Sequence, residues 1–152
     1  MLKGHRNVVQ DDVTYFMNET AERGGVVVLS TAGSGIALDQ SSALVTYASN
    51  SSGKIPVGIL QNDMVNIDLT RQILNRNKDE VQIGGKVTIT VKGWHITDKI
   101  NGTPTAGSKG YLQSSGYIGI TQVSELVNPT LGRFMSTKDE AGFAKFEINL
   151  PQ

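Results

Sequence analysis

Residues 86–96, with the sequence KVTITVKGWHI, carry the strongest structural signal in the chain. Val87, Ile89 and Val91 alternate there with threonine and lysine. A period of two carried by β-branched residues is typical of a strand with one buried face. Gly93 follows and permits a bulge or a kink before Trp94. A strand of this kind needs neighbouring strands that cover its apolar side.

Short apolar segments between turn residues predict those neighbours. The continuous apolar run VVVLS at residues 26–30 predicts a strand buried on both faces. The segments TLGRFMS, at 130–136, and FAKFEINL, at 143–150, predict a hairpin, since alternate residues of the second are apolar. Residues 13–17, 43–47 and 57–60 are further predicted strands. The region 62–85 has neither a helical nor a strand period, and we interpret it as an extended excursion with at most a short strand.

The composition agrees with an all-β chain. No segment has a convincing amphipathic helical pattern, and 17 glycines among 152 residues indicate many turns and short strands. The hydrophobic share of 38% suffices for one modest core. We therefore predict a single all-β domain over residues 13–152, built as a barrel or a sandwich. Residues 1–12 are polar and mixed in charge, and are expected to form an extended N-terminal arm.

The charges and the apolar runs argue against several classes of partner. Lysine and arginine number 14, as do aspartate and glutamate, and the positive charges are spread along the chain. A nucleic-acid-binding protein normally has a basic face, so no nucleic acid is expected. The run at 26–29 is the longest apolar stretch and is far too short for a membrane span. The N-terminus lacks the apolar core of a signal peptide.

Few residues offer chemistry. There is no cysteine, and the two histidines, His5 and His95, lie far apart, so neither a metal nor a cofactor is expected. No serine lies in a G-x-S-x-G turn, and GGK at 84–86 lacks the remaining residues of a phosphate-binding loop. We therefore predict that the chain is not an enzyme. A small hydrolase that uses His95, Asp98 and a serine remains an alternative.

The aromatic residues leave alternatives open. Trp94 is interpreted first as a core residue after the kink at Gly93, and second as a partner contact, since tryptophan is favoured at interface hot spots. His95 is expected on the opposite side of the strand, as a surface or rim residue. Tyr15 and Phe16, beside the arm, either anchor the first strand in the core or dock onto a neighbouring molecule.

The order of these segments resembles a known family. ERGGVVVLSTAGSGIALDQ, IPVGIL, DLTRQILNRNKDEVQIGGKVTITVKGWHITDKI, AGSKGYLQSSGYIG and NPTLGRFMSTKDEAGFAKFEINL follow one another as in the capsid decoration, or cement, proteins of tailed phages. The chain is similar to the marine and cyanophage type of these proteins over about residues 13–150. The resemblance rests on short strands bounded by glycine and on phrases such as TRQ, KDEV and KGW. It involves no catalytic residues.

The resemblance implies a fold and a function. The fold would be a small β-barrel-like, or β-tulip-like, domain of short antiparallel strands. The protein would bind the outer surface of the mature virion head, commonly as a homotrimer, and would stabilise the head by bridging subunits of the major capsid protein. Capsid contacts are then expected at the arm and the first strand, from Lys3, His5, Arg6, Tyr15 and Phe16. The rival reading is a tail- or fibre-associated β-module that binds a host glycan, with Trp94 or Tyr117 as a stacking platform beside Asn and Asp side chains.

Overall fold

The computed structural model describes residues 10–31, 43–66 and 80–150. Strands make up its regular structure, together with a 3-10 turn at Ser114–Gly116. The strands are β1 (Asp11–Met17), β2 (Val26–Thr31), β3 (Leu44–Thr46), β4 (Pro56–Leu60), β5 (Asp63–Val65), β6 (Glu80–Gln82), β7 (Lys86–Thr97), β8 (Ile100–Asn101), β9 (Lys109–Leu112), β10 (Ile118–Gly119), β11 (Thr130–Phe134) and β12 (Ala144–Asn149). The prediction of an all-β fold is confirmed.

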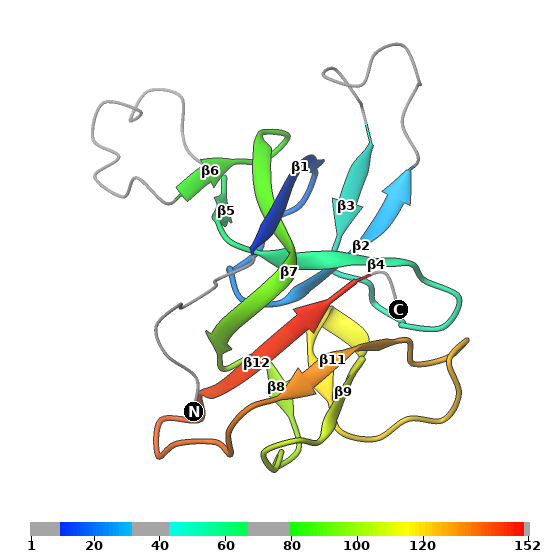
Figure 1. The fold of residues 1–152 in the computed structure, drawn as a ribbon. Helices are drawn as coiled ribbons and strands as arrows, with labels where there is room; N and C mark the ends of the chain where they lie inside the picture. The colour runs from blue at the N-terminus through cyan, green and yellow to red at the C-terminus, as the bar shows by residue number, and fades with distance from the viewer. Residues whose placement is uncertain (1–9, 32–42, 67–79, 151–152) are drawn as a thin grey trace.

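Five strands close into a small barrel in the order β1-β3-β2-β4-β7, with β7 pairing back onto β1 (Figure 1). The predicted barrel is therefore present. The prediction that its strands are antiparallel holds for four of the five neighbouring pairs and is wrong for β1 and β3, which run parallel. The reason is geometric, because a closed ring with an odd number of strands cannot alternate in direction all the way round. The pairs β5–β6 and β8–β10 are parallel as well.

The barrel interior is one of two apolar cores. Each of the five barrel strands contributes to it, and Ala21 and Met64 complete it. Its buried members are Met17, Ala21, Val27, Val45, Leu60, Met64, Val87 and Ile89. Met64 belongs to β5 and pairs with Ala21 through backbone hydrogen bonds of 2.7 and 3.1 Å. The region predicted as an extended excursion thus supplies the short pair β5–β6, of which Met64 reaches the barrel core.

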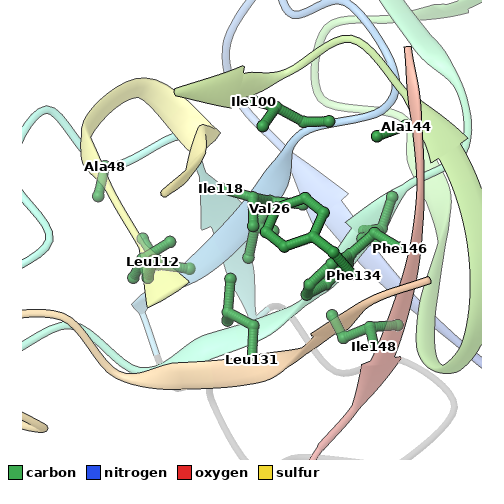
Figure 2. Close-up of a cluster of buried hydrophobic side chains, with 12 residues drawn as sticks. Val26, Ala48, Ile100, Leu112, Ile118, Leu131, Phe134, Ala144, Phe146 and Ile148 are labelled. Atoms are coloured by element: carbon green, nitrogen blue, oxygen red, sulfur yellow. The ribbon is translucent and has the colours of Figure 1, made fainter. Parts of the chain in front are cut away.

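The second core lies between the barrel and a second group of strands. From β7 the sheet continues through β12, β11, β9, β10 and β8 (Figure 1). Figure 2 shows side chains from these strands gathered with Val26 of β2 around Phe134 and Phe146. The two phenylalanine rings meet edge to face, with centroids 4.9 Å apart, and both side chains are fully buried. This arrangement contributes about 0.5–1.5 kcal/mol beyond the burial of the rings.

Strands β2 and β4 separate the two cores, which explains their uninterrupted apolar sequences. Val27 points into the barrel, whereas Val26 and Val28 belong to the second core. In β4, Leu60 points into the barrel, whereas Ile59 belongs to the second core. Because successive side chains of a strand point to opposite faces, a strand between two cores has no polar face. The prediction that residues 26–30 are buried on both faces is confirmed for Val26 to Val28.

Strand β7 joins the barrel to the second sheet. It pairs with β1 and β4 over its first half and with β12 from Lys92 onward. The pairing with β1 is irregular between Asp11 and Asp12, just before the position of Gly93, which has a φ of +146°. The predicted C-terminal hairpin is confirmed, since β11 and β12 pair antiparallel with Arg133 opposite Glu147.

The first strand begins two residues earlier than its sequence pattern indicates. Asp11 and Asp12, assigned to the arm by sequence, pair with β7. The Asp12 carboxylate accepts hydrogen bonds from the Thr90 hydroxyl at 2.8 Å and from the Gln61 amide at 3.0 Å. Thr90 is fully buried, so Asp12 provides a partner for a hydroxyl that has lost contact with water. Polar residues can therefore belong to a strand when a neighbouring strand offers buried polar partners.

Candidate functional site

The predicted capsid-contact residues divide into two groups. Lys3, His5 and Arg6 lie outside the described residues. Tyr15 and Phe16 lie on β1 and are both half-buried. Tyr15 packs against the barrel core, whereas the Phe16 ring has the Lys86 ammonium 5.9 Å from its centroid. As neighbours on a strand they point to opposite sides, so they do not form one contact surface.

His95 and Asp98 both line a depression of about 440 Å³, and the hydrolase alternative requires that these two residues lie near each other. Glu22, Arg23 and Asp63 also line it. Among the described residues that line it there is no serine, so that part of the chain places no serine nucleophile here. Burial lowers the pKa of His95, while the negative charge of Asp12 acts in the opposite direction. The Nε2 atom of His95 is buried and has no hydrogen-bond partner among the described residues.

Trp94 is exposed, so the prediction of a core residue is wrong. Its exposed fraction is 41%, and the Lys145 ammonium lies 3.9 Å from the centroid of the indole. The cause is that the alternation of β7 continues through Gly93, which keeps Trp94 on the solvent side of the sheet. Gly93 and Thr97 are buried, and Trp94 and Ile96 are exposed. The His95 side chain points to the other side of the sheet from Trp94, as predicted.

The exposed position of Trp94 leads to a test of stability. We expect Trp94→Ala to lower the free energy of unfolding by about 1 kcal/mol, the scale of a lost cation–π contact and partial burial. A buried tryptophan would cost about 3–5 kcal/mol. Thermal unfolding of the two proteins measures the difference, which corresponds to about 2–4 °C at this chain length. A shift of more than 8 °C would mean that the side chain is part of a core.

Tyr117 lies in a smaller depression of about 310 Å³, whose lining is part polar and part apolar. Asn101 and Gln113 line it and are joined by a hydrogen bond of 2.6 Å between their side-chain amides. Tyr117 is 38% exposed, and the Lys99 ammonium lies 5.9 Å from its ring centroid. Of the two aromatic platforms suggested for a glycan, Tyr117 is thus the one beside an asparagine in a depression, whereas a lysine covers the indole of Trp94.

Two loops present the most exposed apolar side chains of the described residues. Val123 is 78% exposed, Leu126 is 72% exposed and Ile55 is 65% exposed. Val123 and Leu126 belong to the loop between β10 and β11, and Ile55 to the loop between β3 and β4. The Gly53 amide donates a 2.8 Å hydrogen bond to the Leu126 carbonyl, so the two loops lie together. We call Ile55, Val123 and Leu126 the apolar tip.

Polar side chains hold the loop of the apolar tip in place. The Asn128 side chain is buried, donates to the Leu112 carbonyl at 3.0 Å and to the Ser51 hydroxyl at 3.3 Å, and accepts from the Val123 amide. The Glu125 carboxylate accepts from the Gln122 amide at 2.6 Å and from the Thr130 amide at 3.0 Å. The hydrogen bonds from Thr130 are the main reason why the pKa of Glu125 is lowered.

An apolar depression of about 540 Å³ adjoins this tip. It lies where the barrel strands β1, β2, β4 and β7 meet the ends of the second sheet. Tyr15, Val57 and Val91 line it from the barrel, and Pro129 and Leu150 line it from the second sheet. Ile55 belongs both to its wall and to the apolar tip. Ile55 thus connects the apolar tip to the depression, which is also lined by the Glu125 carboxylate and by Tyr15 from the predicted contacts.

Sequence reasoning missed the apolar tip. The segment TQVSELVNP, at 121–129, contains apolar residues among turn-forming ones, with the period of neither a strand nor a helix. A segment without a regular period has no face on which its apolar residues would be buried together. Apolar residues in an aperiodic segment are therefore the signal that could have identified the exposed side chains of the tip. Exposed apolar side chains that gather in one place indicate a binding surface, whereas scattered single ones do not.

Other kinds of site receive no support from the described residues. No three His, Asp or Glu side chains in that part of the chain come together closely enough to hold a metal ion. The same residues include no helix of the length and apolarity needed to cross a membrane. The chain matches no protein-family model, and no curated protein matches its sequence.

Proposed function

We propose that this chain is a capsid decoration protein, which binds the exterior of a mature phage head and stabilises it by bridging subunits of the major capsid protein. The supporting observation is the apolar tip, because Ile55, Val123 and Leu126 are held exposed by a defined network of hydrogen bonds. Burial of these side chains against a partner would remove apolar surface from water at little cost in loop ordering. The order of strand segments that resembles cement proteins supports the same function.

The proposal includes several partners and properties. The partner is the major capsid protein, the place is the outer surface of the virion, and the assembly is a homotrimer. Several weak contacts made by one trimer add up, because the second and third contacts form at a high effective concentration. The proposal requires neither catalysis nor a cofactor.

The test is the copy number of the chain in purified virions of the phage that encodes it. Quantitative mass spectrometry against the major capsid protein should give hundreds of copies in a simple ratio to that protein. A few copies per virion would place the chain at the tail or at a single vertex. Its absence from virions would refute the proposal.

The apolar tip is tested by substitution. We expect the double variant Val123→Ser, Leu126→Ser to bind purified heads at least ten times more weakly than the natural chain, because both side chains lose their apolar contact. Sedimentation with heads stripped of this protein measures the binding. Ile120→Ser is the control, since Ile120 is also partly exposed, at 38%, but lies outside the tip. Equal loss of binding in the control would show that the tip has no special role.

A second candidate function is the binding of a host glycan by a tail- or fibre-associated module. It is supported by the depression around Tyr117, where an exposed ring lies beside Asn101 and Gln113. A glycan array probed with the natural chain and with Tyr117→Ala tests this function. Binding that disappears in the variant, together with a low copy number in virions, would favour it over decoration.

A further inference from the structure

The solvent side of the second sheet combines positive charge with exposed apolar side chains. We propose that this surface is a second docking site and that its partner is an acidic protein surface. It is defined by Lys92, Trp94, Ile96, Lys109, Arg133 and Lys145, and we call it the outer sheet face. The inference rests on the proposed function, since a single chain that contacts two capsid subunits at once needs a contact surface for each of them, and the apolar tip supplies one per chain.

The strand register places these residues side by side. Trp94 lies opposite Glu147, Glu147 opposite Arg133, and Arg133 opposite Lys109, on the neighbouring strands β7, β12, β11 and β9 (Figure 1). Directly paired residues point to the same side of a sheet, and neighbouring strands are about 4.8 Å apart. The row therefore extends over about 14 Å, three strand spacings, on one side of the sheet.

The charge of this face is positive although the chain as a whole is neutral. Lys92, Lys109, Arg133 and the half-buried Lys145 lie on it. Its carboxylates are Glu147 within the row, Glu125 beside Lys109, and Asp11 of β1, which pairs with Lys92. None of these four cations forms an ion pair with another described residue. Four cations against three carboxylates leave the face with a small positive charge, whereas the 14 cationic and 14 acidic residues of the whole chain balance.

The apolar part of the face is exposed and fixed. Trp94 is 41% exposed and Ile96 is 62% exposed, and Met135, which follows β11 beside the face, is 46% exposed. The Met135 amide donates to the Lys145 carbonyl at 2.8 Å, which holds this residue beside β12. Lys145 in turn lies over the indole of Trp94 at 3.9 Å. Tryptophan and arginine within one patch are typical of interface hot spots, where few residues contribute most of the affinity.

These features favour an acidic protein surface over other partners. A second copy related by a twofold axis would bring together two faces of the same net charge, which is unfavourable. A sugar that stacked on Trp94 would have to displace the Lys145 ammonium from the ring. A partner with carboxylates around an apolar centre would satisfy the cations and cover the indole at the same time.

The test compares Arg133→Glu and Trp94→Ala with Arg23→Glu in binding to purified heads that lack this protein. Arg133→Glu and Arg23→Glu are the same substitution at exposed positions, but Arg23 lies in the loop between β1 and β2, outside both the outer sheet face and the apolar tip. At low salt we expect at least tenfold weaker binding for Arg133→Glu, at least fivefold for Trp94→Ala, and less than twofold for Arg23→Glu. The natural chain should bind more weakly as salt rises, and Arg133→Glu should show a smaller dependence on salt.

The outcomes separate this inference from the proposed function. If the natural chain binds heads and both face variants bind equally well, the outer sheet face is not a docking site, while decoration stands. If the natural chain does not bind heads, decoration fails and the inference fails with it. If Arg133→Glu changes the sedimentation of the free chain but not its binding to heads, the occupant is a second copy. If it abolishes only binding to an immobilised sulfated glycan, the occupant is a carbohydrate. Each of the last two results overturns the inference.

Discussion

Phe146→Ala is expected to lower the free energy of unfolding by about 3–5 kcal/mol, which is a large part of the 5–15 kcal/mol typical of a folded domain. Phe146 is fully buried in the second core and meets Phe134 edge to face. Gly110 leaves room for this ring, because a Cβ at Gly110 would lie 2.3 Å from Phe146 Cε2. The truncated side chain would leave a cavity between the barrel and the second sheet, and the strands on both sides cannot collapse into it without breaking their pairing.

The measurement is chemical denaturation of the natural chain and the variant. Phe143→Ala is the matched control, since Phe143 lies three residues earlier and is 40% exposed. We expect a change of about 1 kcal/mol or less in the control. A loss in Phe146→Ala no larger than in Phe143→Ala would mean that the second core contributes little to stability.

Gly132→Ala is expected to cost about 3 kcal/mol or more, at or above the upper end of the usual range for overpacking. A Cβ at this position would lie 1.9 Å from the backbone oxygen of Glu147 on the paired strand β12. Backbone cannot move aside as a flexible side chain can, so β11 and β12 would have to separate. The same hairpin carries Phe134 and Phe146, and the separation would disturb the core below it.

Thermal unfolding followed by circular dichroism measures this effect. Arg133→Ala is the control, because Arg133 is the next residue of the strand and points to solvent. Its stability should change by about 0.5 kcal/mol or less. A Gly132→Ala protein as stable as this control would show that the two strands tolerate a wider spacing at this position.

The candidate surfaces were only partly predictable. Tyr15 was expected at a contact surface and lines the apolar depression, although Phe16 beside it points elsewhere. Trp94 was expected in a core because Gly93 permits a kink, and it lies on the solvent side because the alternation continues. The apolar tip was missed, since its residues belong to a loop without periodicity. Loop side chains are placed by particular hydrogen bonds, such as those of Asn128, and no local pattern encodes them.

The sequence by itself determined the class of fold and the main strands. Alternation at residues 86–96 and in the C-terminal hairpin, and the apolar run at 26–30, follow from the period of the β-strand, which is a local property of the chain. The tertiary structure decided which strands are neighbours, that β1 and β3 run parallel, and that β2 separates two cores. It also brought Trp94, Glu147, Arg133 and Lys109 into one row. These features depend on pairing between segments far apart in the chain, and local periodicity carries no information about which strands pair.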